Sequence, residues 1–270
     1  MLKDITLGQY YPADSVLHRM DPRVKLIGTF AYIVILFIVN NYIGYLLGGI
    51  FLLSMIIISK VPVKFMIRGM KSIAFLIIIA TIFNIFSIKG EVIATIWKLE
   101  ITKEGIFTAA KMAIRLVFLI MGSSIMTLTT TPNQLTDGLE SIMRPLRVIK
   151  VPVHEIAMMM SIALRFIPIL MEETDRIMKA QMARGVDFES GNIFIKVKNM
   201  IPLLVPLFVS AFRRANDLAM AMEARCYRGG EGRTKMKPLR YARIDVIGYL
   251  VLILFLVVSV LFGRMGILGI

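Results

Sequence analysis

Residues 246–262 read VIGYLVLILFLVVSVLF, a run without a single charged side chain. The hydrocarbon core of a bilayer is about 30 Å thick, so an α-helix that crosses it needs about 20 mostly apolar residues. The run comes close to that length, and it is the most apolar part of the chain. It therefore predicts a membrane-spanning helix and decides the fold class.

Four further apolar runs precede this one. Apolar residues make up 57% of the 270-residue chain, against about 45–50% in soluble domains. We therefore expect an all-α integral membrane protein with about five transmembrane helices. The other four predicted spans are Leu26–Val39, Tyr42–Ile58, Ser72–Ile88 and Ile106–Leu128.

The distribution of Lys and Arg predicts how the spans are oriented. Four basic residues precede the first span, and Lys60, Lys64, Arg68 and Lys71 follow the second without an acidic neighbour. In the connection between spans three and four, which contains Trp97, Lys and Glu balance. Cytoplasmic loops carry the excess of Lys and Arg. We therefore expect the N-terminus inside, the C-terminus outside, and a multi-pass protein of a prokaryotic plasma membrane.

The net charge of +14 fits either a nucleic-acid partner or the anionic cytoplasmic face of a membrane. The high apolar content favours the bilayer, and we expect no nucleic-acid partner. The chain then divides into a four-helix membrane domain (1–130), a cytoplasmic segment (131–245) and a final span (246–270).

The cytoplasmic segment lacks strand signals, so we interpret it as long amphipathic helices rather than a soluble domain. Thr131, Pro132 and Gln134 predict a capping box and a short helix, which Pro145 ends. A second helix is expected from about Pro152 to Ala183, with Pro168 inside it. A third is expected from about Pro202 to Arg225.

The two long predicted helices end alike, in Ala183-Arg184-Gly185 and Ala224-Arg225-Cys226. One interpretation is an ordinary helix C-terminus, where Arg meets the negative end of the dipole and a small residue permits the left-handed cap. The other is a pair of cationic docking tips for acidic sockets, since Arg engages carboxylates with two hydrogen bonds. The repetition favours docking.

Motifs of common catalytic and metal sites do not occur in the sequence. There is no Gly-x-x-x-x-Gly-Lys-Ser/Thr loop, no His-Glu-x-x-His and no Gly-x-Ser-x-Gly. Cys226 is the single cysteine, and His18 and His154 are the only histidines. We expect no catalytic residues, no metal site, no cofactor and no enzymatic activity in this chain.

The paired tips resemble the Ala-Arg-Gly signatures of the transmembrane T component of energy-coupling factor (ECF) transporters. The stretches Leu128–Pro132 and Ala163–Pro168 are similar to that family as well, and the likeness covers most of the chain. Cys226 departs from the pattern, which usually has glycine or another small residue there.

The resemblance implies a coupling subunit for vitamin or micronutrient uptake. Its coupling helices would dock through Arg184 and Arg225 on two ABC-type ATPase subunits, which hydrolyse the ATP. Ala183 and Ala224 would allow close approach, and Gly185 would release the chain from the helix. A substrate-binding S component would sit in the membrane against the upper apolar surface of these helices.

Two other functions stay open at this point. One is a T component dedicated to a single cobalt, nickel or biotin system, which the sequence does not separate from a shared one. The other is a permease with its own substrate path, which predicts polar residues facing each other within the spans. The strongly apolar spans count against that second alternative.

Overall fold

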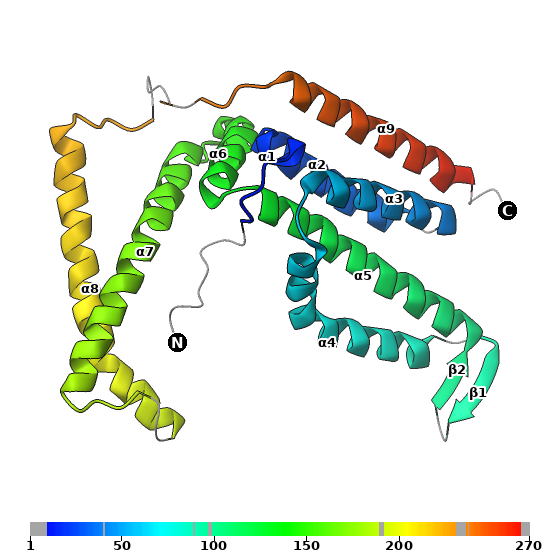
Figure 1. Ribbon diagram of the computed structural model, residues 1–270, viewed down its shortest axis with the longest axis horizontal. Helices are drawn as coiled ribbons and strands as arrows, with labels where there is room; N and C mark the ends of the chain where they lie inside the picture. The colour runs from blue at the N-terminus through cyan, green and yellow to red at the C-terminus, as the bar shows by residue number, and fades with distance from the viewer. Residues whose placement is uncertain are drawn as a thin grey trace. The chain divides into compact units, whose positions relative to one another are not determined.

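The computed structural model describes residues 10–265 except 40, 89, 97–98, 189–191, 231–235 and 237. Figure 1 shows that these residues are almost entirely helical. They form two compact units. We call residues 10–139 with 239–265 the membrane unit, and residues 140–238 the arm unit.

The membrane unit begins with a short helix and three longer ones. These are α1 (Val16–Arg19), α2 (Pro22–Ile38), α3 (Tyr42–Ser59) and α4 (Val63–Ser87). A hairpin of β1 (Val92–Ile96) and β2 (Leu99–Thr102) leads into α5 (Lys103–Thr129) and then α6 (Pro132–Met143). The chain returns to this unit at its end with α9 (Arg243–Met265).

The last helix packs against the first two long ones, although it lies more than 180 residues away in the sequence. α9 contacts α2 and α3, and α5 contacts α2, α3 and α4. The Phe51 and Phe255 rings stack with their centroids 4.2 Å apart, and the Tyr32 and Phe51 rings stack at 5.8 Å. Such aromatic packing adds to the burial of Leu36 and Leu52 in the shared core.

The prediction of an all-α integral membrane protein is confirmed. Within the described residues, five helices are long and apolar enough to cross a membrane, namely α3, α5, α7, α8 and α9. Three of these are predicted spans. Of the other two predicted spans, the first lies in α2, a helix of 17 residues, and the third lies in α4, which bends between its two segments. The helices α7 and α8 were expected to be amphipathic, and they also have the length and composition of a span.

The β1–β2 hairpin lies in the third connection, where no strands were predicted. The strands pair antiparallel, with Ala94 opposite Ile101 and Ile96 opposite Leu99. Thr102 then caps α5, because its hydroxyl accepts the Gly105 N–H at 3.1 Å and donates to the Ile88 carbonyl at 2.7 Å. Trp97, the tryptophan noted in this connection, lies outside the described residues.

The capping box that starts α6 is confirmed. The Thr131 N–H donates to the Gln134 side chain at 3.1 Å, and the Gln134 N–H donates to the Thr131 hydroxyl at 3.3 Å. The helix ends at Met143, as Pro145 predicts, and the 3₁₀ helix η2 (Arg144–Ile149) follows. The division of the chain into 1–130, 131–245 and 246–270 with respect to the membrane stays a prediction.

The arm unit consists mainly of α7 (Val153–Ala183) and α8 (Ile193–Ala224). The bounds of α7 agree with the prediction. The predicted start of the next helix near Pro202 is wrong, because α8 begins at Ile193 and contains Pro202 and Pro206. The Ile195 and Lys196 N–H groups donate to the Asn192 carbonyl, so a complete first turn forms upstream. Figure 1 shows that α8 changes direction in its first part, and prolines inside a helix cause such bends.

Candidate docking ends of the two long helices

The C-terminus of α7 closes with a specific hydrogen-bond pattern at the first Ala-Arg motif. The Gly185 N–H donates to the Met182 carbonyl at 2.9 Å, and the Val186 N–H donates to the Gln181 carbonyl at 3.0 Å. Gly185 has φ +87°. These are the features of a Schellman cap, which satisfies carbonyls that would otherwise have no partner at the helix end. Arg184 is the last residue before the left-handed position.

The C-terminus of α8 closes with the same pattern at the second motif. The Cys226 N–H donates to the Glu223 carbonyl at 2.8 Å, and the Tyr227 N–H donates to the Met222 carbonyl at 3.0 Å. Cys226 has φ +56°, so it takes the left-handed position that Gly185 takes on α7. The two motifs therefore have the same backbone geometry. The sequence indicated this likeness, but it did not show that Cys226 takes the left-handed conformation.

Both tips present their side chains to solvent. Ala183, Arg184 and Gly185 are exposed, and so are Ala224, Arg225 and Cys226. Among the residues that the structure describes, neither Arg184 nor Arg225 has an ion pair. The small Ala at each tip leaves the guanidinium as the protruding group, and this suits insertion into an acidic groove.

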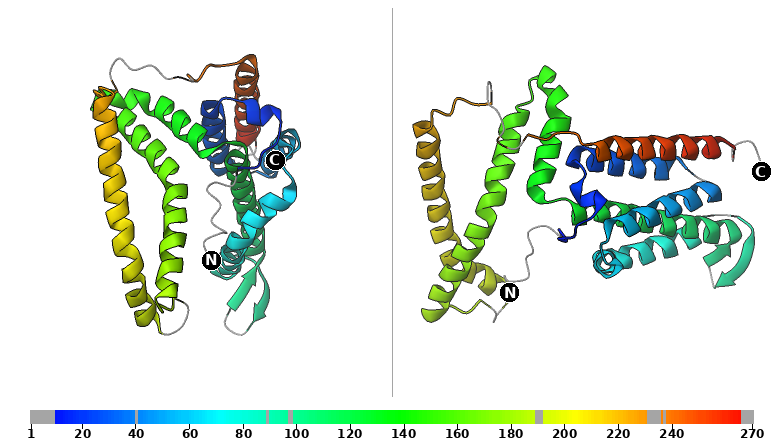
Figure 2. Two further views of the ribbon diagram at one scale, coloured as in Figure 1. Left: turned by 60° about the vertical axis from the view of Figure 1, so that its left-hand side comes forward. Right: turned by 45° about the horizontal axis from the view of Figure 1, so that its top comes forward.

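The helices α7 and α8 run antiparallel, so the two tips lie at opposite ends of the pair (Figures 1 and 2). The Gln181 side chain donates to the Pro202 carbonyl at 3.3 Å, and Arg214 pairs with Glu173 at 3.0 Å. Asp175 and Lys179, four residues apart on α7, also form an ion pair at 2.8 Å. A helix of 31 residues is about 45 Å long at 1.5 Å per residue. Because the tips lie at opposite ends of the pair, they are two separate surfaces rather than parts of one site.

Substitutions at the left-handed positions of the two caps should change the stability of the protein in opposite directions. A non-glycine residue in the left-handed conformation costs roughly 1–2 kcal/mol. Replacing it by glycine removes this cost, but the greater conformational entropy of glycine in the unfolded chain offsets part of the stabilisation. We expect Cys226→Gly to raise the free energy of unfolding by about 0.5–1 kcal/mol and Gly185→Ala to lower it by about 1 kcal/mol. Thermal unfolding in detergent would measure both variants, and a loss of stability in Cys226→Gly would contradict the cap geometry.

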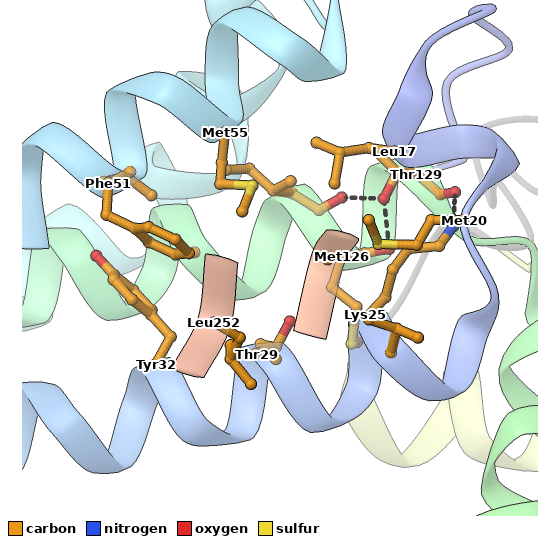
Figure 3. A pocket seen from close by; sticks show the side chains of 16 residues that line it. Leu17, Met20, Lys25, Thr29, Tyr32, Phe51, Met55, Met126, Thr129 and Leu252 are labelled. Carbon is orange, nitrogen blue, oxygen red and sulfur yellow. Dashed lines mark hydrogen bonds between the residues drawn. The ribbon is translucent and has the colours of Figure 1, made fainter. Parts of the chain in front are cut away.

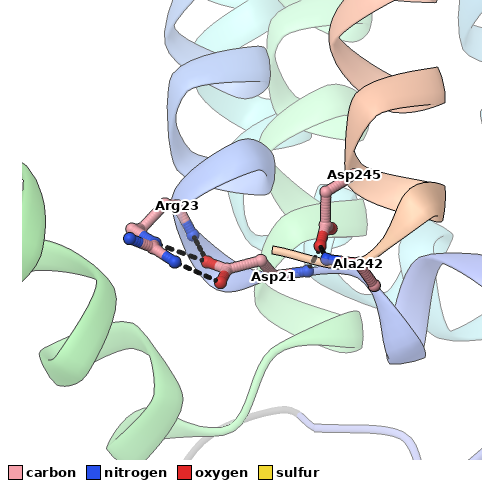
Figure 4. Close-up of polar contacts among 4 residues, drawn as sticks. All are labelled: Asp21, Arg23, Ala242 and Asp245. Atoms are coloured by element: carbon pink, nitrogen blue, oxygen red, sulfur yellow. Dashed lines mark hydrogen bonds and ion pairs between the residues drawn. The ribbon is translucent and has the colours of Figure 1, made fainter. Parts of the chain in front are cut away.

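A polar cluster at the start of α2 was not predicted. Asp245 lies in the first turn of α9, close to the start of α2 (Figure 4). Its carboxylate accepts the Asp21 N–H at 2.7 Å and the Ala242 N–H at 2.6 Å. Asp21 in turn accepts hydrogen bonds from Arg23 through Nε at 3.0 Å and Nη2 at 2.8 Å. The only sequence signal is the run Asp-Pro-Arg-Val-Lys at 21–25 together with one acidic residue at 245, next to the last span.

The charges of this cluster compensate one another. Burial works against the charged Asp21 carboxylate, but hydrogen bonds from Arg23 and its positive charge outweigh burial and lower the pKa of Asp21. The Arg23 guanidinium lies 3.8 Å from the centre of the Tyr241 ring. At neutral pH the Asp21–Arg23 pair is therefore fully charged. Because the pKa of Asp21 is lowered, the stability that the pair contributes is lost only when the pH falls through the pKa of Asp21 in the folded protein.

Lys25, one turn further along α2, is also buried. Its ammonium donates to the Thr129 carbonyl at 2.8 Å, at the end of α5 (Figure 3). A cavity of about 90 Å³ lies beside it, and its lining is apolar except for Lys25, Thr29, Tyr32 and Thr129.

Comparison with known proteins decides the family. Residues 13–236 match the family model described as CbiQ, cobalt transport protein. The chain belongs to the T-component family of ECF transporters.

Relatives cover nearly the whole length of this T component. The energy-coupling factor transporter transmembrane protein EcfT of Ruminiclostridium cellulolyticum is 57% identical over 247 residues, with 92% of each chain covered. The EcfT protein of Clostridium kluyveri is 54% identical over 263 residues, with 97% of each chain covered. That of Bacillus subtilis is 47% identical over 246 residues, covering 91% of this chain and 93% of the relative. The protein is thus a transmembrane component of a transporter, as the resemblance implied.

Proposed function

We propose that this T component is the coupling subunit that transmits the motion of two ABC-type ATPase subunits to a substrate-binding S component. The observation that carries the proposal is the pair of identically capped, exposed Ala-Arg tips at opposite ends of an antiparallel helix pair. The names of the relatives support the transporter context. Catalysis of ATP hydrolysis belongs to the partner chains in this proposal.

The chemistry of the tips favours acidic sockets on the ATPases. An Arg guanidinium stays charged at all physiological pH values and offers two parallel N–H groups to a carboxylate. The Schellman caps leave the carbonyls at each helix end largely satisfied, so the tip presents a net positive charge rather than exposed acceptors. Arg184 and Arg225 carry the contact, and the small residues around them permit close approach.

The long apolar surface of α8 supports an S component as the membrane partner. Its exposed apolar residues continue over several turns and include Phe194, Met200, Leu204, Phe208 and Phe212. In water such a continuous patch would be a docking surface for a protein or for lipid. We propose that α7 and α8 lie on the cytoplasmic side with this surface toward the bilayer, the N-terminus inside and the C-terminus outside.

The S component sets which compound is transported in this proposal, so vitamin or micronutrient uptake is assigned to the complex. The family description names cobalt transport, and a T component dedicated to one metal ion or to biotin remains the alternative. The partners distinguish the two. A dedicated system has one S component, and a shared system has several.

Affinity purification from the native membrane tests the proposed function. We expect the tagged chain to retain two ABC-type ATPase subunits, identified by mass spectrometry, together with at least one small membrane protein. A tagged, unrelated polytopic protein of the same membrane is the control for unspecific capture. Recovery of the chain without any ATPase, in a detergent that keeps it folded, would overturn the proposal.

A further inference from the structure

Within the described residues, from residue 10 onward, the chain passes between its two compact units twice. It leaves the membrane unit within α6, after Leu139, and it re-enters that unit at Leu239, shortly before α9. These two connections are covalent links through which a displacement of the arm unit reaches the membrane unit. The side chains that hold the two connections in place are therefore candidates for transmitting such a displacement.

The first connection is held by α2. Lys25 is 6% exposed, and its ammonium donates to the Thr129 carbonyl, one of the last backbone acceptors of α5. In the following helix, α6, a Cβ on Gly138 would lie 3.1 Å from Leu26 and 3.2 Å from Pro22 of α2. The end of α5 and the first turns of α6 are thus fixed on the start of α2.

The second connection is held by the same turn of α2. Asp245 is 1% exposed and uses one carboxylate oxygen for the N–H of Asp21 and the other for the N–H of Ala242. Tyr241, just upstream, stacks on Arg23, and Arg23 is held in turn by Asp21. The re-entering chain is therefore fixed to α2 immediately before α9 begins.

We propose that Asp21, Arg23 and Lys25, here called the α2 clamp, are positioning residues that fasten both exits of the arm unit to the membrane unit. The inference rests on the proposed coupling function. With both exits fixed, displacement of the arm by the ATPases must move the membrane unit with it. If the connections were not fixed, they would change conformation in response to the same displacement, and the membrane unit would stay in place.

The chemistry of the clamp argues for more than stability. Buried charged groups in pairs are often no better for stability than apolar residues of similar size. The Arg23 and Lys25 side chains contact segments that border the two exits, and Asp21 binds Asp245 through its N–H and Arg23 through its carboxylate. These contacts have defined directions. Apolar packing alone would permit these segments to slide.

A double variant, Arg23→Gln with Lys25→Met, tests the clamp. It removes the charged donors but keeps most of their volume. The matched control is Arg19→Gln with Lys64→Met, because Arg19 pairs with Asp14 through the same two-bond geometry at an exposed site. Both proteins are studied with their ATPases and S component in proteoliposomes. The ratio of substrate taken up to ATP hydrolysed should fall about 5-fold or more in the clamp variant and stay unchanged in the control.

A second measurement does not depend on the partners. A spin label on the native Cys226, which is exposed, and another on Val16→Cys of α1 report the distance between the arm unit and the membrane unit in the isolated protein. We expect the distance distribution to broaden in the clamp variant only. An unchanged distribution together with an unchanged transport ratio would overturn the inference. Failure of the wild-type chain to bind ATPases would instead overturn the proposed function, and the distance measurement would still decide whether the clamp exists.

Discussion

Reversing the charge of both helix tips, with Arg184→Glu and Arg225→Glu together, is expected to abolish co-purification of the ATPase subunits. Each tip presents one guanidinium beside a small residue, and the Schellman cap leaves little else there to bind a partner. Loss of one partner from a buried charge pair costs about 2–5 kcal/mol, and a Glu facing an acidic socket adds repulsion. Either single variant should lose one ATPase contact and retain the other.

The matched control for this experiment lies on the same two helices. Arg176 on α7 and Arg213 on α8 are exposed and lie away from the tips, so Arg176→Glu with Arg213→Glu makes the same change of net charge. We expect this variant to retain both ATPases. Stoichiometric ATPase binding by the tip variant, or equal losses in the two variants, would exclude docking through the tips. Membrane insertion of all variants should persist, as fractionation would show.

Chemical labelling of Cys226 is expected to give an all-or-none result. It is the one cysteine in the sequence, it is exposed, and in the proposed orientation its segment lies in the cytoplasm. A membrane-impermeant maleimide should leave intact cells unlabelled and should label inside-out vesicles completely. The chain is produced without its ATPases, so that docking does not shield the thiol.

The Cys226→Ser variant provides the background for the labelling experiment. A permeant maleimide, applied to intact cells, verifies that the thiol is reactive in the folded protein. Labelling of intact cells by the impermeant reagent would reverse the proposed orientation of the arm and of both termini. The labelling result is independent of which compound the transporter carries.

The sequence predicts the local features of this fold better than its long-range ones. Two local predictions are confirmed, namely the capping box at Thr131 and Gln134 and the end of α7 at Ala183. Both features depend on side chains within a few residues. The start of α8 was misplaced because Pro202 is favourable at a first turn but is also tolerated inside a helix at the cost of a bend. The β1–β2 hairpin was missed because its few residues carry no strong turn signal.

For the candidate site, the sequence predicts the residues of the tips and not their arrangement. The repeated Ala-Arg motifs identify Arg184 and Arg225, but only the antiparallel packing of α7 on α8 places them at opposite ends. The α2 clamp was missed for a different reason. Asp21 and Asp245 are 224 positions apart, and no periodicity within one helix indicates that they meet.

The Arg214–Glu173 contact has a consequence for how the arm would move. Glu173 precedes the tip residue Ala183 by ten positions, and Arg214 precedes Ala224 by the same number, which is about 15 Å along each helix. The contact therefore lies equally far from both tips along their helices. Forces of equal size applied across the helices at the two tips would exert equal torques about it.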